Sequence, residues 1–450
     1  MTDTWRAPSR PSLLRVRHIL RDPRRWTRER MVAYQEERLR AIVHHAYERV
    51  PYYRRLFDAH ALRPQHIRTL ADLTKIPITS RGDLQASAVR DVVAAGIDPG
   101  RLITSTTSGS SGEPLTIRRT WLEQSVLSVL RRRAMHYLGA RPGDRVVTIG
   151  RERRAHPRDT KVVGRVLAAV GLERRVKLDV SLGAATLVDR LCELRPDVVI
   201  GYSGTLGLLA GLLDAEPRAE LRPRLVVTGA EVLTEDMRAR ITRTFHAPVF
   251  DTYGSHEFNL LAWECRDTGA MHTCDDGMIL EVLQADAPAT EGDRGEVVGT
   301  SLHSYAMPFI RYRLGDLVTR GALRCRCGLP FATIGAIQGR MIDSFPMPDG
   351  RVLHPYDLLR AFKRGNDEWI RQHQILQERI DRVVLRVVPG ATMPIDAHAR
   401  LHAALAALLG PAVTVQVELV REIPIETTGK FRVARSQVYS EYDGVASDVG

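Results

Sequence analysis

The chain predicts an α/β fold with a large amino-terminal unit and a smaller α+β unit at the carboxyl terminus. Between residues 145 and 253, short apolar runs alternate with helical segments of about ten residues. After Gly277 the apolar runs follow one another closely, and from Gly339 onward a shorter mixture of strands and a helix closes the chain. Strands that alternate with helices form parallel βαβ units. We therefore expect doubly wound sheets with a small β-subdomain beside them.

The periodicity of apolar residues predicts the individual elements in order. The first is an amphipathic helix over Met31–Val50. In the parallel region we expect strands at Arg145–Gly150, Asp197–Tyr202, Arg224–Thr228 and Val249–Tyr253. The helices between them are expected at Lys161–Val170, Ala184–Leu194, Leu206–Leu213 and Glu235–Phe245.

The rest of the chain predicts antiparallel strands followed by the small unit. The closely spaced strands are expected at Met278–Leu283, Gly295–Ser301 and Phe309–Tyr312. In the small unit we expect strands near Ile375, at Val383–Val388 and at Val413–Leu419, with a helix over Ala397–Leu409.

Composition and charge narrow the class of protein. The 450 residues are 44% hydrophobic and 26% charged, which suffices for one large core and a smaller one. The net charge is +12, but the sixty arginines are scattered and only five lysines accompany them, so we expect no nucleic-acid surface. The charge suits an anionic ligand such as ATP or CoA. No apolar run has the length of a membrane span, and Trp5–Arg30 lacks the apolar core of a secretory signal, so we expect a soluble cytoplasmic protein.

The most informative segment is Thr107–Pro114, which reads TSGSSGEP. Its hydroxyl groups and glycine N–H groups can close around phosphate oxygens, because glycine lets the backbone approach closely. The segment lacks the Gly-Lys-Ser/Thr ending of a P-loop. Taken alone, it could equally be a flexible turn.

Three further segments of the same kind follow it. Asp251–Glu257 (DTYGSHE) ends a predicted strand, where ligands bind in open α/β sheets. Arg311–Asp316 (RYRLGD) places an acid directly after glycine, with Gly339-Arg340 beyond it. Pro424–Lys430 (PIETTGK) sets a lysine on a glycine-containing turn near the end of the chain.

These four motifs, in this order, resemble those of the adenylate-forming superfamily of acyl-CoA synthetases, luciferases and peptide-synthetase adenylation domains. Three other stretches are similar to the phenylacetate–CoA ligase-like branch, which includes capsule-biosynthesis relatives. They are His45–Tyr53, Ile76–Leu84 and Gln374–Asp381. The resemblance covers nearly the whole chain. It implies that residues 1–338 bind ATP and an acid, and that residues 339–450 carry the catalytic lysine and rotate about a hinge near Gly339–Asp343.

The resemblance also implies roles for individual residues. The β- and γ-phosphates of ATP would be held by Ser108, Gly109, Ser110, Ser111 and Gly112. The rest of the nucleotide would be bound by Gly229, Ala230, Glu231, Asp251, Thr252, Tyr253, Gly254, Asp316 and Arg340. Among these, Tyr253 would lie against the adenine, and Asp316, with help from Arg340, would accept hydrogen bonds from the ribose. Two residues would be catalytic: Glu257 would hold Mg²⁺, which prefers carboxylate oxygen, and Lys430 would neutralise the reacting carboxylate and α-phosphate.

The implied reaction is ATP-dependent activation of a carboxylic acid. Attack of the carboxylate on the α-phosphorus gives an acyl-AMP and pyrophosphate, and a thiol then takes the acyl group, so the chain would be an acyl- or aryl-CoA ligase. This chemistry needs positioning and charge neutralisation rather than a protein nucleophile. One alternative is an adenylating ligase that passes the acyl group to an amine or a carrier protein. A further alternative is a non-catalytic nucleotide-binding homologue.

Two positions depart from the pattern of the resembled family. The polar hinge residue usual two positions after Arg340 is replaced by Ile342, which leaves the details of domain rotation open. The phosphate loop has Glu113 where many members have lysine, which removes one positive charge. Neither change removes a residue assigned to adenylation.

The acyl substrate is expected beside the strand ends, with Tyr202, Ser203 and His256 as candidates for its pocket. Aromatic and small residues there suit a flat aryl acid, although His256 could instead contact the acyl acceptor. No carrier segment is evident, so a carrier protein would be a separate chain. A homodimer is also compatible with the sequence.

Cysteine spacing indicates a structural zinc site. Cys265 and His272 are separated by six residues, and Cys325 and Cys327 form a knuckle-like pair. Three thiolates and an imidazole suit tetrahedral Zn²⁺. Cys274 is an alternative to His272 as the fourth ligand, and reduced, inert thiols are the alternative to a metal site.

Overall fold

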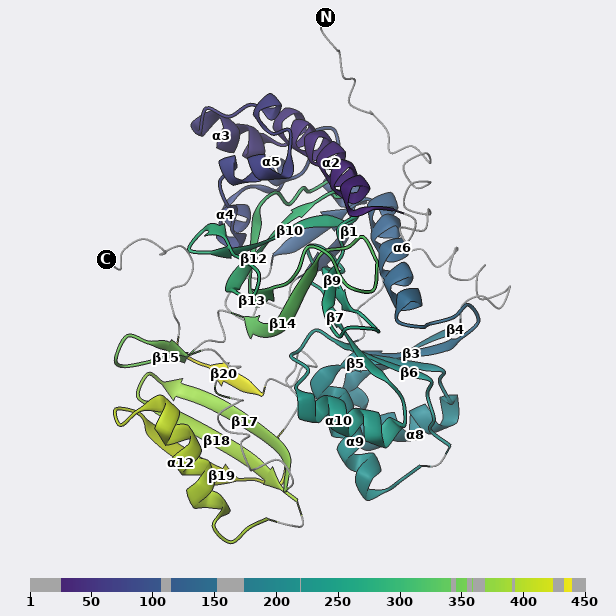
Figure 1. The fold of residues 1–450 in the computed structure, drawn as a ribbon, viewed down its shortest axis with the longest axis vertical. Coiled ribbons are helices and arrows are strands. Elements are labelled where there is room, and N and C mark those ends of the chain that lie inside the picture. Colours follow the sequence, from purple (N-terminus) through teal and green to yellow (C-terminus); the bar gives the residue numbers. More distant parts are fainter. Residues whose placement is uncertain are drawn as a thin grey trace, which may run out of the picture.

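The fold is described from a computed structural model (Figure 1). The structure describes residues 26–106, 115–151, 174–218, 220–340, 345–353, 358, 369–390, 393–423 and 433–438. Within these ranges the centre of the molecule is one sheet of 12 hydrogen-bonded strands, in the order β11-β10-β12-β13-β14-β9-β8-β7-β6-β5-β3-β4.

Five neighbouring strands of this sheet are parallel. They are β3 (Arg145–Gly150), β4 (Arg174–Asp179), β5 (Val198–Tyr202), β6 (Leu225–Gly229) and β7 (Val249–Tyr253). Since β4 lies on one side of β3 while β5, β6 and β7 follow on the other, the winding reverses at β3. The predicted doubly wound topology is confirmed, and a crevice is expected at the carboxyl ends of β3 and β5.

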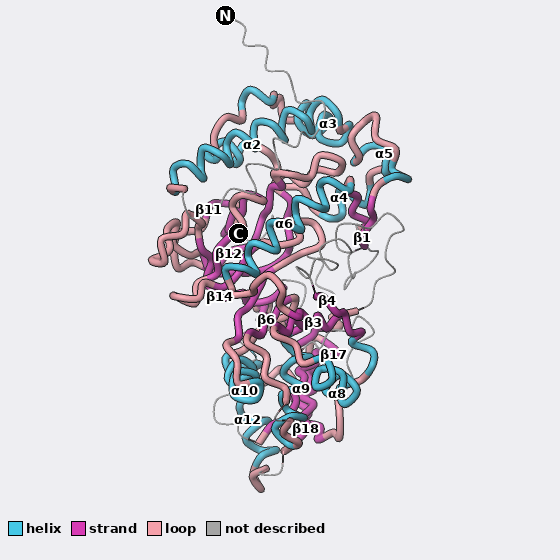
Figure 2. The backbone as a smooth tube through the Cα atoms, turned by 90° about the vertical axis from the view of Figure 1, so that its right-hand side faces the viewer, coloured by secondary structure: helices cyan, strands magenta, loops and turns pink. Residues whose placement is uncertain are grey.

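Alternating side chains of the parallel strands enter two different cores. Val146 and Val198 face the core formed with α2 (Arg28–Arg49) and α6 (Trp121–Tyr137). Their neighbours Val147 and Val199 face the core formed with the helices on the other side of the sheet. Those helices are α8 (Ala184–Leu194), α9 (Ser203–Ala215) and α10 (Glu235–Phe245). Figure 2 shows the resulting layers, with α2 and α6 toward one end of the molecule and α8, α9 and α10 toward the other.

Most of the predicted elements in this region are confirmed. The predicted bounds of β3, β7, α8 and α10 coincide with those observed, and those of β5, β6 and α2 differ by a few residues at most. Helix α9 is longer than predicted at both ends. The predicted helix Lys161–Val170 lies outside the described residues. Strand β4 and helix α6 were not predicted, although Thr120 and Glu123 form a capping box at the start of α6.

Antiparallel strands continue the same sheet beyond β7. They are β8 (Ala262–Glu264), β9 (Met271–Thr273), β10 (Met278–Gln284), β11 (Ala287–Pro288), β12 (Arg294–Ser301), β13 (Tyr312–Arg320) and β14 (Thr333–Arg340). Thr252 pairs with Trp263 where β7 meets β8. The expected β-subdomain is therefore joined to the parallel strands by continuous backbone hydrogen bonding.

The predicted strand Phe309–Tyr312 is wrong except at its last residue. Arg311 has a left-handed φ of 45°, which interrupts an extended strand, and β13 begins only at Tyr312. Gly315 also has a positive φ of 75°, and the pairing of β13 with β14 shifts register near Leu317. Asp316 consequently lies inside an irregular part of strand β13.

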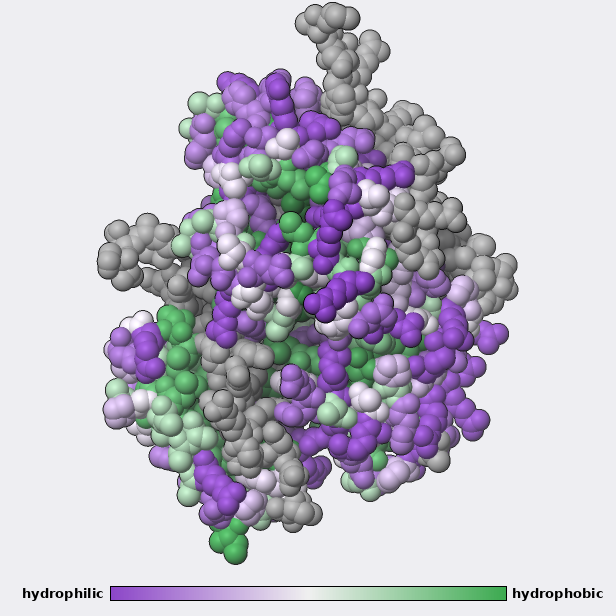
Figure 3. All heavy atoms as spheres, viewed as in Figure 1, coloured by the Kyte–Doolittle hydropathy of each residue, from purple (hydrophilic) through white to green (hydrophobic). Residues whose placement is uncertain are grey.

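The amino-terminal part covers one side of the sheet. After α2 come α3 (Pro51–Ala59), η2 (Pro64–His66), η3 (Leu70–Lys75), α4 (Arg81–Ala86), α5 (Val89–Val92) and η4 (Pro99–Arg101). The hairpin of β1 (Ile103–Thr106) and β2 (Thr116–Arg119) then flanks residues 107–114. The outer face over α2 and α3 is mostly hydrophilic (Figure 3), as expected for amphipathic helices. No helix of the described part is long and apolar enough to cross a bilayer.

The carboxyl-terminal part has its own sheet, in the order β19-β18-β17-β20. Its strands are β17 (Ile370–Arg379), β18 (Arg382–Pro389), β19 (Thr414–Leu419) and β20 (Ala434–Ser436), and a separate pair is formed by β15 (Phe345–Pro346) and β16 (Val352–Leu353). Helix α12 (Ala397–Leu409) packs Leu401 and Leu405 against Val383 and Leu385. The predicted helix is confirmed over its full length, and the predicted strands are confirmed with shifted ends.

Candidate functional site

The carboxyl ends of β6 and β7 approach each other so closely that a glycine is required. A Cβ atom on Gly229 would lie 2.7 Å from Thr252 Oγ1 and 2.8 Å from its carbonyl oxygen. The next residue, Ala230, has a left-handed φ of 65°. Residues other than glycine adopt this backbone conformation only at a cost in free energy. This turn directs the chain away from the sheet edge, and it lies among the residues that the sequence assigns to the nucleotide.

Tyr202 lies at the reversal point of the sheet. It ends β5, and its hydroxyl oxygen would be 3.7 Å from a Cβ on Gly150 at the end of β3. The phenol ring of Tyr202 therefore lies beside Gly150, at ordinary van der Waals distance from where a Cβ would be. Tyr202 thus lies where open α/β sheets bind ligands, and its predicted contact with the acyl substrate is compatible with this position.

Glu231 and Ser203 connect the β6 turn to the start of α9. The Glu231 carboxylate accepts a hydrogen bond of 2.7 Å from Gly204 N–H. The Ser203 hydroxyl donates to the Glu231 carbonyl oxygen at 3.2 Å, and Ser203 is fully buried. As a direct ligand of the acid, Ser203 would have to give up this bond. In the structure both residues hold the turn that carries Ala230.

Asp251 belongs to a buried network beneath the strand ends. Its Oδ1 accepts hydrogen bonds from the Thr228 hydroxyl at 2.7 Å and from Thr252 N–H at 2.9 Å. Its own N–H donates to Glu264, which forms a 2.9 Å ion pair with Arg238. Burial raises the pKa of Asp251 to about 6, despite the opposing effect of these hydrogen bonds. Asp251 and Thr252 therefore stabilise the ends of β6 and β7, which carry the site.

Tyr253 and Asp316 form the direct link between the parallel and antiparallel parts of the site. The Tyr253 hydroxyl, at the end of β7, donates a 2.5 Å hydrogen bond to Asp316 Oδ2 on β13. Both residues are almost buried. The backbone of Asp316 pairs with that of Arg340 at the end of β14. Three residues assigned to the nucleotide from distant motifs are thus neighbours in the structure.

Glu257 and His256 lie on the turn after β7. A Cβ on Gly254 would be 2.5 Å from the Asn259 carbonyl oxygen, so the tight turn requires glycine there. The Glu257 carboxylate accepts a 3.2 Å hydrogen bond from the Tyr312 hydroxyl. Glu257 is 8% exposed, whereas Tyr312 is buried at the start of β13. A mostly buried carboxylate of this kind can hold a hard divalent cation.

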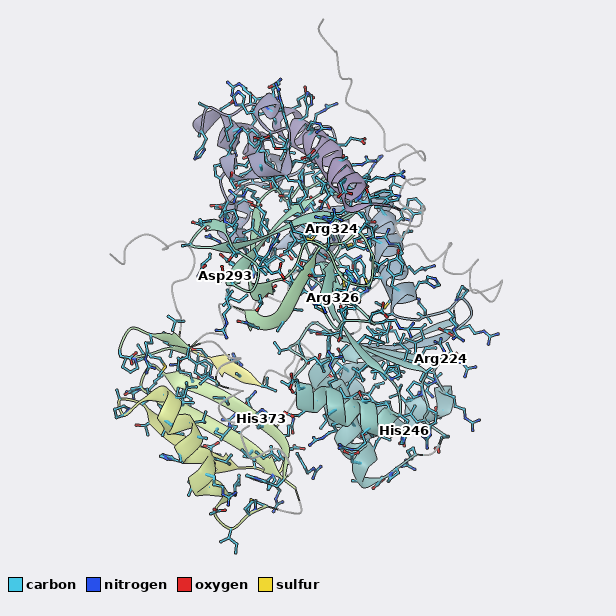
Figure 4. All side chains as sticks on the ribbon, in the orientation of Figure 1. Arg224, His246, Asp293, Arg324, Arg326 and His373 are labelled. Atoms are coloured by element: carbon cyan, nitrogen blue, oxygen red, sulfur yellow. The ribbon has the colours of Figure 1, made fainter. Side chains whose placement is uncertain are left out.

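A second cluster of polar groups lies farther along the antiparallel strands. Ligand atoms of Cys265, His272, Cys325 and Cys327 all lie within 4.8 Å of one another. The Cys327 sulfur is 3.3 Å from His272 Nε2, and the Cys325 and Cys265 sulfurs are 3.9 Å apart. The four residues come from the β8–β9 hairpin and the β13–β14 turn. Figure 4 labels Arg324 and Arg326, which flank Cys325 in that turn.

Burial has opposite consequences for metal binding at the imidazole and at the Cys327 thiol of this cluster. Burial lowers the pKa of His272 to about 4, so its imidazole is neutral at pH 7 and able to bind a metal. Burial, together with the neighbouring thiols, raises the pKa of Cys327 to about 12. A bound cation would reverse this effect, because it stabilises thiolates. The donor set fits tetrahedral zinc.

Cys274 lies outside the cluster. Its thiol is buried and donates a weak hydrogen bond, 3.7 Å long, to Asp276, and Asp276 also forms a buried ion pair with Arg133 of α6 at 2.5 Å. Of the two candidates left open for the fourth ligand, the structure brings His272 to the other three residues and keeps Cys274 away. The adjacent Asp275 is paired with Arg28 at the start of α2.

Several assigned residues cannot be placed. The phosphate loop, Ser108 to Gly112, lies outside the described residues, as do the hinge position Ile342 and the lysine at 430. The side chain of Arg340 is likewise not described. Their roles remain predictions.

Sequence reasoning missed two residues that hold the site together. Tyr312 binds the Glu257 carboxylate, and Arg119 donates to the carbonyl oxygens of His256 and Glu257. The sequence gives a weak indication that Arg119 is buried. It lies two positions after Ile117 in a short β-like stretch, so the two side chains point to the same face. Nothing in the sequence pairs either residue with Glu257, because the partners are far apart in the chain.

Comparisons with known proteins agree with this arrangement. Residues 345–437 match the family described as the CapK C-terminal domain. A phenylacetate–coenzyme A ligase of Thermus thermophilus is 31% identical over 331 residues, which cover 70% of this chain and 72% of that protein. One from Escherichia coli is 29% identical over 301 residues, or 64% of this chain and 67% of that protein.

The fold also matches solved structures. A 2-hydroxyisobutyryl-CoA ligase in its post-adenylation state superposes with a TM-score of 0.74 at 22% identity, covering 92% of this chain and 90% of that chain. The identity and coverage of the Thermus relative, added to the motifs and to the placement of Tyr253, Asp316 and Glu257, establish the family. The chain belongs to the phenylacetate–coenzyme A ligase family, a branch of the adenylate-forming ligases.

Proposed function

We propose that the protein is an AMP-forming acid–thiol ligase. It activates a carboxylic acid with ATP, releases pyrophosphate, and transfers the acyl group from acyl-AMP to CoA. The observation that carries this function is the Tyr253–Asp316 hydrogen bond of 2.5 Å, which brings two nucleotide motifs into one site. Family membership supports the same reaction, since the matched relatives are named as CoA ligases.

In this reaction the chain's own residues bind, orient and neutralise charge. Asp316 accepts hydrogen bonds from the ribose, and Tyr253 presents its ring to the adenine while its hydroxyl stays on Asp316. Glu257 would hold Mg²⁺, which supplies positive charge to the phosphates. Ser108 to Gly112 bind the phosphate oxygens. Because the reaction needs no protein nucleophile, positioning accounts for most of the catalysis.

The small domain, residues 339–450, contributes Lys430 to the first step. The lysine neutralises the acid's carboxylate and the α-phosphate as they meet. A hinge near Gly339 then turns this domain for the second step. The match of the CapK C-terminal domain to residues 345–437, which begins just after β14, supports a domain boundary near Gly339.

Replacing the lysine tests this assignment. Lys430→Ala is expected to lower acid-dependent pyrophosphate release by about 100-fold or more, because an oriented charge that acts in the transition state is lost. ATP affinity should stay within about threefold, since Asp316 and Tyr253 are unchanged. Rapid-quench measurement of acyl-AMP, with equilibrium binding of ATP in parallel, separates the two effects. Adenylate formation at the wild-type rate would remove the lysine from the mechanism.

The acid is proposed to be aromatic. Tyr202 offers a flat ring beside Gly150 at the crevice of the sheet, and the matched relatives are named phenylacetate–coenzyme A ligases. Pyrophosphate release over a panel of aryl and short aliphatic acids tests this proposal. A preference for aliphatic acids would contradict it, while leaving adenylation itself intact. No release with any acid would contradict the enzymatic function.

A second candidate for the acyl acceptor competes with CoA. The small domain, which would take part in the second step, matches a family named for CapK rather than for a CoA ligase. An amine or a separate carrier protein therefore remains a second candidate acceptor. Mass spectrometry of products formed with CoA, with amines or with no acceptor decides between them. A thioester formed only with CoA would exclude the alternative.

The cysteine cluster is proposed to hold one structural zinc ion. Four protein ligands leave no open position for catalysis, so the ion would join the β8–β9 hairpin to the β13–β14 turn. Nearby salt bridges tie both segments to α2: Arg28 pairs with Asp275, and Glu29 pairs with Arg324. His272 itself packs against the rings of Trp263 and Phe331, which also contact each other.

A further inference from the structure

A buried arginine connects the phosphate-loop hairpin to the backbone of Glu257. Arg119 is the last residue of β2 and is 5% exposed. Its Nη2 donates to the carbonyl oxygen of His256 at 2.7 Å and to that of Glu257 at 2.5 Å. One guanidinium nitrogen shared by two consecutive carbonyls fixes the peptide between them. The direction in which the Glu257 side chain leaves the backbone is thereby restricted.

Arg119 is itself held by its surroundings. The next residue, Thr120, begins the capping box of α6, in which Glu123 Oε2 accepts from Thr120 N–H at 2.7 Å. The other oxygen of the Glu123 carboxylate accepts from Tyr305 N–H at 2.6 Å and Ala306 N–H at 2.8 Å. The chain therefore turns from β2 into α6 at a fixed position. Arg119 cannot shift along β2 without breaking this box.

The charges around Arg119 explain why a cation is tolerated there. Burial lowers the pKa of its guanidinium, and the nearby carboxylates of Glu123 and Glu257 oppose that effect. Removal of Arg119 would leave two carbonyl oxygens without their donor and two acidic groups without a buried cation between them. Both losses act on the turn that carries Glu257.

The location of Arg119 links two parts of the nucleotide site. Thr106 of β1 pairs with Thr116 of β2, and residues 107–114, which are proposed to bind the phosphates, come between these two residues in the chain. The far end of β2 contacts the turn after β7 through Arg119. A side chain of the strand that follows the proposed phosphate-binding segment thus fixes the backbone of the proposed magnesium ligand.

We propose that Arg119 is a positioning residue that orients Glu257 for Mg²⁺ by holding the His256 and Glu257 carbonyls. This inference rests on the proposed role of Glu257. Arg119 acts through the His256–Glu257 backbone and needs no contact with the metal or with ATP. Outer residues that orient a metal ligand typically change metal affinity by about 10- to 100-fold when replaced.

The test measures metal binding directly, with Mn²⁺ as a spectroscopic substitute for Mg²⁺. Electron paramagnetic resonance follows Mn²⁺ titrated into the protein–ATP complex of the wild type and of Arg119→Met, which keeps bulk but donates no hydrogen bond. We expect the variant to bind Mn²⁺ about tenfold more weakly. The Mg²⁺ concentration for half-maximal pyrophosphate release should rise by a similar factor. The variant should transfer the acyl group from supplied acyl-AMP to CoA at the wild-type rate, because this step releases no pyrophosphate.

Arg224→Met is the matched control. Arg224 also joins distant segments, since it donates to the Gly139 carbonyl at 2.8 Å and pairs with Asp144 at 2.6 Å. It precedes β6, at the end of the sheet opposite to the strand ends that form the site (Figure 4). Its replacement should lower the melting temperature without changing Mn²⁺ binding. A general loss of packing would affect both arginine variants alike.

If the methionine variant does not fold, Arg119→Gln replaces it in the test. The glutamine side chain is neutral and shorter, so its amide cannot reach both carbonyl oxygens. Mn²⁺ binding of wild-type strength in either folded Arg119 variant overturns the proposal. Equal weakening in the Arg224 control also overturns it. These outcomes differ from failure of the proposed function, which would appear as wild-type protein that releases no pyrophosphate with any acid.

Discussion

The parallel and antiparallel halves of the 12-stranded sheet contribute different groups to the site. The parallel half supplies mainly backbone, through the close approach at Gly229 and the left-handed Ala230, together with the side chain of Tyr202 at the end of β5. The antiparallel half supplies side chains, with Asp316 and Tyr312 on β13 and the cysteine cluster beyond them. Tyr253, at the end of β7, joins the two halves.

The difference follows from how each half is assembled. Adjacent parallel strands end at the same edge, so consecutive motifs meet there with little help from side chains. The antiparallel strands are irregular at the site, where Gly315 has a positive φ and β13 shifts register against β14. Their order depends on long-range contacts such as the cysteine cluster and the Tyr253–Asp316 bond. We therefore expect side-chain replacements to affect the antiparallel half more strongly.

The largest effect is expected for the cysteine cluster. Cys327→Ser should lose the approximately one equivalent of zinc expected in the wild type and lower the melting temperature by several degrees, because metal binding is coupled to folding of the segments that supply the ligands. Elemental analysis and calorimetry measure both. Cys274→Ser is the control: it removes a buried thiol outside the cluster and should keep the metal. Wild-type protein without metal, and with the melting temperature of Cys327→Ser, would refute the site.

A smaller effect is expected from two buried aspartates, one in each half. Asp316→Asn should raise the KM for ATP by roughly 30- to 100-fold, because the charged acceptor of two proposed ribose hydrogen bonds is lost. Asp251→Asn should change this KM by less than about threefold, since Asp251 contacts Thr228 and Thr252 beneath the site. Initial rates of pyrophosphate release against ATP concentration provide both values. Equal effects would show that the two halves do not differ in this way.

The last expected effect is a change in how stability depends on pH, without any change in activity. The pKa of Asp251 is about 6 in the folded protein against an ordinary 3.8, so between these values the unfolded chain has lost a proton that the folded chain retains. Raising the pH through this window therefore costs stability, on the order of 3 kcal/mol, and above it the cost is constant. Asp251→Asn should remove this dependence.

Urea unfolding between pH 4 and 7.5 measures this dependence. The wild type should lose more free energy of unfolding over this range than Asp251→Asn. Asp316→Asn is the comparison variant, because it removes a buried carboxyl from the other half without altering Asp251. Identical slopes in wild type and Asp251→Asn would show that burial does not keep Asp251 protonated.

The sequence alone located four of the five parallel strands, all except β4, and it predicted the chemistry of the motifs. Apolar runs such as Val249–Tyr253 are buried on both faces, and helices such as Glu235–Phe245 begin at a cap, so local pattern is sufficient to locate them. The order of the four motifs identified the family. The spacing of Cys325 and Cys327 likewise indicated half of a metal site from the sequence alone.

Only the tertiary structure decided which distant groups meet. It placed Asp316 within an irregular strand against Tyr253, grouped His272 instead of Cys274 with Cys265, Cys325 and Cys327, and joined the expected β-subdomain to the main sheet. It also revealed the contact of Arg119 with Glu257. Periodicity reports the environment of one segment at a time. These contacts depend on register, bulges and the packing of segments far apart in the chain, which no local pattern contains.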